Sequence, residues 1–248
     1  MRKVFIDCGA YDGCSIKLFR EKCDPNYEYE IFSFEPPPPD PHRDILGCPC
    51  DDPDCILRAP PQVDLKSESL EKAAKDYQAK IIRKAVWVCD SEILFYGDLD
   101  AGSTAIGERM FTNGDPVSKT RQDTAYMVEC IDLSKWIRKT FDKEDHIELK
   151  MDIEGAEYEV IKRMHKDGTL GMINKFSGEL HGTKVRKTRA ETDKLLEYCS
   201  DYGLKMYIWD AINSADVGSK YYNRETLDNE FDKWEKRFDK SAWGNLDR

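Results

Sequence analysis

The chain has 248 residues, and 38 lysines and arginines against 48 aspartates and glutamates leave a net charge of −10. The length allows one large domain or two small ones, and the acidic balance argues against a nucleic-acid substrate, because phosphate binding needs concentrated Lys and Arg. A mean hydropathy of −0.68, with no apolar run near the ~18–20 residues of a membrane helix, excludes a polytopic membrane protein.

The first residues form a β-α-β pattern. Residues 4–6 are apolar and predict a strand, residues 14–23 carry apolar groups at helical spacing, and residues 29–34 alternate as a second strand. Two strands joined by a helix imply a parallel sheet. The run at 4–6 is too short for a signal peptide, and the odd number of nine cysteines favours mostly free thiols, so we expect a cytoplasmic protein.

The segment 36–66 interrupts this pattern. It holds most of the chain's eleven prolines and no periodicity, which predicts an insert or a lid loop. A helix is expected from residue 67 to 78, with Ser67 as its N-cap.

The rest of the chain alternates between strands and helices. Strands are expected at 81–89, 93–96, 127–131, 147–153, 176–180 and 204–209. Helices are expected at 133–141, 156–164, 191–202 and about 227–238, and 97–125 is expected to be a loop. The whole of 1–248 is interpreted as a single α/β domain, with 213–248 as a charged C-terminal extension.

The segment 7–13, Asp-Cys-Gly-Ala-Tyr-Asp-Gly, follows the first strand. Its glycines let the backbone approach a ligand, and the next helix offers free N–H groups. It does not match the dinucleotide fingerprint G-x-G-x-x-G, since Gly9 has no glycine at 11. The carboxylate of Asp7 would repel a pyrophosphate but suits a cationic amino-acid end such as that of S-adenosylmethionine. An ordinary strand–turn–helix is the alternative.

Two further acids follow strands. Glu35 comes directly after residues 29–34, where a carboxylate can accept hydrogen bonds from both hydroxyls of a ribose. Asp90 follows the expected third strand, where it could hold an adenine amino group. A solvated loop acid and a common turn residue are the respective alternatives.

Residues 150–157, Lys-Met-Asp-Ile-Glu-Gly-Ala-Glu, span a strand-to-helix junction. Lys150, Asp152 and Glu154 alternate and so share one face of a strand. Taken singly, Glu154 and Glu157 are also ordinary acids of a first helical turn.

Together, residues 6–13, 34–36 and 149–157 resemble the FkbM-like S-adenosylmethionine-dependent methyltransferases, with K-x-D-x-E-G-A-E as the most specific part. The resemblance covers roughly residues 3–212 and departs from the family at Cys8 and at the 36–66 insert. It implies a Rossmann-like class I fold, with a mostly parallel seven-stranded sheet, a reversed last hairpin and flanking helices. It also implies O-methylation, often of sugar or polyketide hydroxyls.

The resemblance also implies roles for individual residues. The methionine end of S-adenosylmethionine would be lined by Asp7, Gly9 and Gly13, the ribose would be bound by Glu35, and Ser103 or Thr104 could reach the cofactor from the long loop. Ala10, Asp12 and Asp90 are further candidate cofactor-binding residues. The reacting centre would be faced by Lys150, Asp152 and Glu154.

Glu179 and His181 share a face at the end of another expected strand. Methyl transfer requires a group that removes the proton of the acceptor oxygen, and His181 is the histidine at a strand's carboxyl end. As the base, it would make the rate fall below about pH 6.5. A surface histidine is the alternative.

Metal sites are not favoured. Asp152, Glu179 and His181 have the ligand types for Mg²⁺ or Mn²⁺, which leaves a divalent ion open as an alternative. His42, Cys48, Cys50 and Cys55 lack the C-x-x-C spacing of a structural zinc site, which favours a cysteine-containing loop.

The sequence therefore predicts an S-adenosylmethionine-dependent O-methyltransferase acting on a hydroxyl of a sugar, glycan or similar polyhydroxylated acceptor. The alternative is a non-catalytic protein of this fold that binds a glycan or a protein partner. A nicotinamide oxidoreductase is disfavoured by the missing central glycine.

Overall fold

The computed structural model describes residues 1–38, 65–96, 105–106, 125–183, 185, 187–209 and 220–237. Ser103, Thr104, the cysteines of the 36–66 insert and most of that insert lie outside these residues, so the expectations about them are not addressed by the structure.

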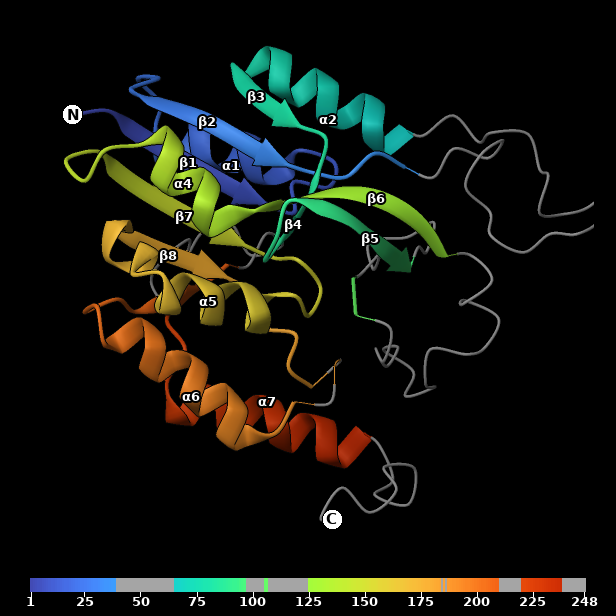
Figure 1. Cartoon of the computed structure of the whole chain (residues 1–248), viewed down its shortest axis with the longest axis vertical. Coiled ribbons are helices and arrows are strands. Elements are labelled where there is room, and N and C mark those ends of the chain that lie inside the picture. The colour runs from blue at the N-terminus through green and yellow to red at the C-terminus, as the bar shows by residue number, and fades with distance from the viewer. Residues whose placement is uncertain are drawn as a thin grey trace, which may run out of the picture.

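The central sheet has six parallel strands (Figure 1). In sheet order they are β3 (Ala79–Ile82), β2 (Tyr29–Phe34), β1 (Lys3–Cys8), β7 (His146–Met151), β8 (Lys175–Gly178) and β9 (Met206–Ile208). The chain proceeds outward from β1 in one direction and from β7 in the other. The boundary between β1 and β7 is therefore a topological switch point, the place where sheets of this kind bind ligands.

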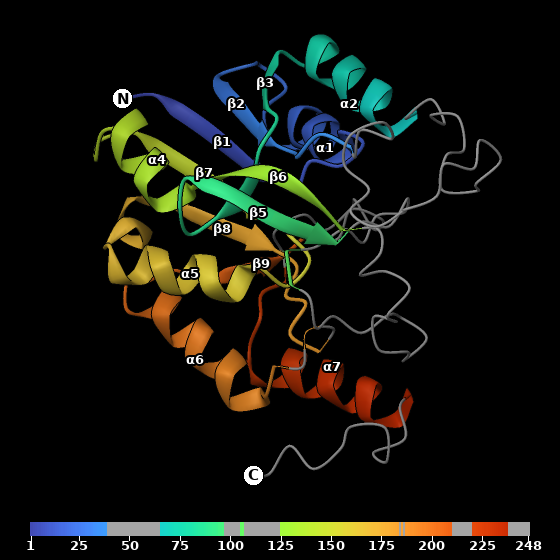
Figure 2. The same cartoon turned by 45° about the vertical axis from the view of Figure 1, so that its right-hand side comes forward.

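Helices cover both faces of this sheet. In β1, Phe5 packs toward α1 (Cys14–Lys22) and α2 (Leu65–Asp76), whereas Val4 and Ile6 pack toward α4 (Leu133–Thr140) and α5 (Glu157–Lys166). This is the alternation that a strand buried on both faces requires. Figures 1 and 2 show α5, α6 (Arg189–Ser200) and α7 (Arg224–Arg237) following one another on one side of the molecule; the short 3₁₀ helix η2 (Thr169–Met172) precedes β8.

A second sheet has the order β4 (Ala85–Trp87), β6 (Ala125–Asp132) and β5 (Ser91–Tyr96), with β4 parallel and β5 antiparallel to β6. The single strand expected at 81–89 is therefore wrong. The N–H of Lys84 donates to the carbonyl of Ile82 at 2.8 Å, which closes a tight turn. The chain thus leaves the central sheet at β3 and enters the second sheet at β4.

The expected α/β fold with a mostly parallel sheet is confirmed. Within the described residues the central sheet has six strands rather than seven, and the expected reversed hairpin is represented by one antiparallel bridge between Tyr207 and Tyr221. The expected N-cap at Ser67 is also wrong, because α2 already begins at Leu65.

The described residues also bear on the expectations about membrane helices and free thiols. None of the helices in the described ranges has the length and apolar character needed to cross a membrane. The six cysteines placed by the structure all carry free thiols.

Candidate functional site

The carboxyl ends of four neighbouring strands are level with one another. In register, Cys8 lies opposite both Phe34 and Met151, and Met151 lies opposite Gly178. The residues that follow these strand ends, in sheet order, are Glu35, Gly9, Asp152 and Glu179. Parallel pairing thus gathers residues that are far apart in the sequence along one edge, at the switch point.

Gly9 sits where the loop after β1 passes β7. Its φ is +86°, and a Cβ there would lie 1.9 Å from the carbonyl oxygen of Asp152, so only glycine fits. Gly13, also at positive φ, has a different reason: a Cβ would lie 2.5 Å from the Cβ of Ala73 in α2. The structure therefore explains Gly13 by helix packing.

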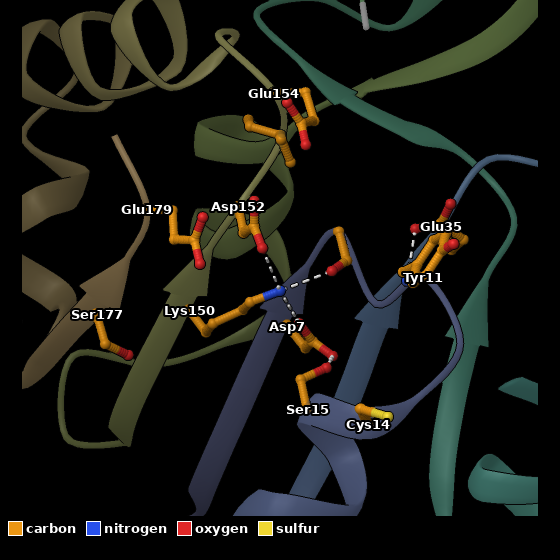
Figure 3. Close-up of polar contacts among 12 residues, drawn as sticks. Asp7, Tyr11, Cys14, Ser15, Glu35, Lys150, Asp152, Glu154, Ser177 and Glu179 are labelled. Atoms are coloured by element: carbon orange, nitrogen blue, oxygen red, sulfur yellow. Dashed lines mark hydrogen bonds and ion pairs between the residues drawn. The ribbon is translucent and has the colours of Figure 1, made fainter. Parts of the chain in front are cut away.

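Asp7 and Lys150 form a buried pair across the switch point (Figure 3). The Lys150 Nζ lies 3.2 Å from Asp7 Oδ1 and 3.7 Å from Asp152 Oδ2, and it donates to the carbonyl of Gly9 at 2.6 Å. Burial lowers the pKa of Lys150, but Asp7 and Asp152 more than offset it, so the net pKa is raised. Asp7 also accepts from the Ser15 hydroxyl at 2.6 Å and is fully buried. Its carboxylate therefore ties the end of β1 to the start of α1 and stabilises the loop between them.

Glu35 lies at the end of β2, facing the same loop. Its Oε2 accepts from the backbone N–H of Tyr11 at 2.9 Å, and burial raises its pKa to about 7. Ala10 is buried, and Asp12 accepts from the backbone N–H of Cys14 at 3.0 Å at the start of α1. Loop and carboxylate thus form one polar unit beside β1.

His181 lies at the centre of a carboxylate cluster. The side chain is 3% exposed, and Nδ1 lies 3.0 Å from Glu157 Oε1. Its Nε2 lies 3.7 Å from Asp152 Oδ1 and 3.6 Å from the Oε2 atoms of both Glu154 and Glu179. Asp152, Glu179 and His181, named above as possible ligands of one ion, therefore lie close together. All three follow the strands rather than belong to them, because β7 ends at Met151 and β8 at Gly178.

Glu157 is the member of this cluster whose role was not anticipated. The sequence suggests only a first-turn helix acid. In the structure its carboxylate is fully buried and accepts three hydrogen bonds: from the backbone N–H of Ile153 and of Gly155, both at 2.9 Å, and from His181. The turn that aims these N–H groups has Glu154 at φ +57° and Gly155 at φ +105°. The only hint of this role in the sequence is that Glu157 is the last residue of the E-G-A-E segment.

The charges around His181 change the expected chemistry. Burial alone would lower its pKa, but Glu157, by charge and hydrogen bond, together with Glu179 and Glu154, raises it to about 10. Burial also raises the pKa of Asp152. An imidazolium has no lone pair for a proton, so a fall in rate below pH 6.5 no longer follows from His181.

Asp90 lies apart from these contacts. It is exposed in the turn before β5, where it accepts from the backbone N–H of Asp132 at 3.1 Å and pairs with Lys135 at 2.5 Å. Both contacts attach it to the start of α4. Its contact with an adenine stays a prediction.

The C-terminal helix reaches the cluster. The N–H of Leu180 donates to the hydroxyl of Tyr222 at 3.1 Å, and Leu227 of α7 is buried in the main core. Burial, followed by the charge of Glu179, raises the pKa of Glu230 in α7 to about 7. The segment after β9 therefore contributes a further carboxyl group near His181.

Comparison with known proteins identifies the family of the chain. The model of the methyltransferase FkbM domain matches residues 7–206. This range includes at least part of every strand of the central sheet, the loop after β1 and the cluster around His181. Neither the curated proteins nor the solved structures yield a significant match. With most of its length matched to that domain and its motifs gathered at one sheet edge, the chain belongs to the FkbM methyltransferase family.

Proposed function

We propose that the chain is an S-adenosylmethionine-dependent O-methyltransferase that acts on a hydroxyl group of a sugar or similar polyhydroxylated acceptor. One observation carries this proposal: the loop after β1, with Glu35, lies on the same sheet edge as the Asp152–His181 cluster, and Lys150 links the two. Methyl transfer needs a cofactor site and an acceptor site side by side.

The loop half suits the cofactor. Gly9 leaves the backbone without a side chain at the switch point, and Glu35 presents a carboxylate beside the Tyr11 N–H, where ribose hydroxyls can donate to it. Asp7 and Lys150 act as positioning residues, because they form an ion pair with each other and Lys150 donates a hydrogen bond to the carbonyl of Gly9 in the loop. When bound, S-adenosylmethionine supplies a methyl group on a sulfonium, which is a ready leaving group.

The cluster half suits a hydroxylated acceptor. Asp152 is the carboxylate that borders both the loop and His181, and its side chain is 28% exposed. We assign it contact with the acceptor hydroxyl, from which it accepts a hydrogen bond and, as the new bond to the methyl group forms, the proton. Carboxylates accept hydrogen bonds from neighbouring hydroxyls, and their shared negative charge disfavours an anionic acceptor.

The test is methyl transfer from labelled S-adenosylmethionine to a panel of neutral sugars, using the full chain. Asp152→Asn should lower turnover by about 10²–10⁴-fold, while the affinity for S-adenosylhomocysteine stays near wild type. Asp201→Asn is the matched control, because Asp201 pairs with an exposed histidine, His165, outside the site. The proposal fails if S-adenosylhomocysteine gives no thermal shift at saturation, or if Asp152→Asn methylates as fast as the control.

A further inference from the structure

The imidazole of His181 has one nitrogen whose partner is not supplied by the described part of the chain. Its Nδ1 is 3.0 Å from the Glu157 carboxylate, and because a carboxylate only accepts hydrogen bonds, Nδ1 carries the proton. The Nε2 atom is buried and has no hydrogen-bond partner among the described residues. A buried polar atom without a partner indicates a missing ligand. In the free protein the surrounding carboxylates favour a proton on this nitrogen, and a bound cation would replace that proton.

Carboxylate oxygens surround that nitrogen. Asp152, Glu154 and Glu179 each place one at 3.6–3.7 Å from Nε2. These distances exceed the ~2.7–3.2 Å of a good hydrogen bond. They exceed by less than 1 Å the ~3 Å that separates neighbouring ligand atoms on one octahedral cation, so an inward movement of the side chains would bring four ligand atoms onto one ion, with water in the remaining positions.

The elements of the cluster are arranged to converge. Figure 3 shows Asp152 and Glu179 beyond the ends of neighbouring strands, with Glu154 on the turn that continues from Asp152. Side-chain atoms of Asp152, Glu157 and His181 also lie within 4.8 Å of one another. Glu157 is held by two backbone N–H groups and by Nδ1, so it acts as the outer carboxylate that fixes the ring, an arrangement typical of metal-bound histidines.

We propose that His181 Nε2, with the carboxylates of Asp152, Glu154 and Glu179, forms a binding site for one divalent cation of the Mn²⁺ and Mg²⁺ class. Oxygen ligands with a single imidazole favour these hard ions over copper or nickel. The cation offsets the surplus of carboxylate charge and lies where the acceptor hydroxyl is proposed to bind. There it would polarise the hydroxyl and favour loss of its proton.

The site is tested by titrating Mn²⁺ into chelator-treated full-length chain, followed by the electron paramagnetic resonance of free Mn²⁺. Mn²⁺ is the suitable probe because the thiolates of Cys48, Cys50 and Cys55 select softer metals. We expect one saturable site. Glu179→Gln, whose parent side chain is 43% exposed, should weaken binding at least tenfold without unfolding the chain.

His165→Ala is the control, since His165 pairs with Asp201 at 2.9 Å on the surface and should leave Mn²⁺ binding unchanged. Glu157→Gln should weaken binding about 10–100-fold as a positioning residue, with the ring nitrogens of His181 shifted in their ¹⁵N resonances. Absence of Mn²⁺ binding at millimolar concentration, or equal binding by Glu179→Gln and wild type, overturns the proposal. Cofactor and acceptor are left out, so this result is separate from the test of methyl transfer.

Discussion

If the proposed function is right, the raised pKa of Glu35 should make binding of the cofactor depend on pH. In the free protein burial raises that pKa to about 7, so the carboxyl group is largely protonated at pH 5.5 and largely ionised at pH 7.5. Ribose hydroxyls donate to the ionised form. If only this form binds, the competent fraction rises from about 0.03 to about 0.8 over this range, and the affinity rises by about 25-fold, or ~2 kcal/mol.

Isothermal titration with S-adenosylhomocysteine between pH 5.5 and 7.5 measures this dependence. Near pH 6 the reaction should also release close to one proton, which is seen by comparing buffers of different ionisation enthalpy. Glu35→Gln should bind more weakly at pH 7.5 and lose the pH dependence, whereas Glu68→Gln on the exposed face of α2 should keep it. A dissociation constant that changes less than about threefold over the range in wild type would refute the reasoning.

The same carboxyl group affects the stability of the free protein. Its folded-state pKa lies above the ordinary glutamate value of 4.5, so the folded chain holds the proton more tightly than the unfolded chain. Its contribution is therefore complete below pH 4.5 and is lost as pH rises toward 7. Glu35→Gln should flatten the fall in the free energy of unfolding across that window, as measured in urea.

Three substitutions test the structural supports. Lys150→Met leaves the buried Asp7 carboxylate without its cation and should cost ~3–5 kcal/mol in urea unfolding; a cost under 1 kcal/mol would contradict a buried ion pair. Gly9→Ala forces a methyl group against the Asp152 carbonyl at positive φ, and should cost ~1–3 kcal/mol and remove the thermal shift by S-adenosylhomocysteine; an unchanged shift would show that this loop is not involved. Asp24→Ala leaves the buried Arg20 without its carboxylate partner and should lower the free energy of unfolding by ~3–5 kcal/mol in the same assay. A loss below 1 kcal/mol would count against a buried ion pair.

Local patterns were enough to predict the part of the fold that carries the loop after β1. The strand, helix and strand expected at the start of the chain correspond to β1, α1 and β2, because each element has its own hydrophobic period. Because parallel strands end at one edge, acids that follow such strands lie along that edge, and the register places Glu35 and Asp152 on either side of Gly9.

What the sequence missed depends on long-range pairing. Residues 85–87 continue the apolar pattern of 81–82, and nothing local shows that β4 pairs with β6 while β3 pairs with β2. Glu157 was similarly hidden, since an acid in a first helical turn is ordinary. Its function depends on a left-handed turn before it and on a histidine 24 residues later.

The buried carboxylate of Glu157 also affects which ligands the turn between β7 and α5 can accept. In many α/β proteins the N–H groups at such a place receive the phosphate of a ligand. Here the N–H groups of Ile153 and Gly155 already donate to Glu157, which belongs to the chain itself. A phosphate could accept from these N–H groups only by displacing the Glu157 carboxylate, and the two negative charges would then repel each other. In the turn before α5 a carboxylate of the chain thus occupies the place of an anionic ligand, which disfavours a nucleoside diphosphate there through charge and lost hydrogen bonds.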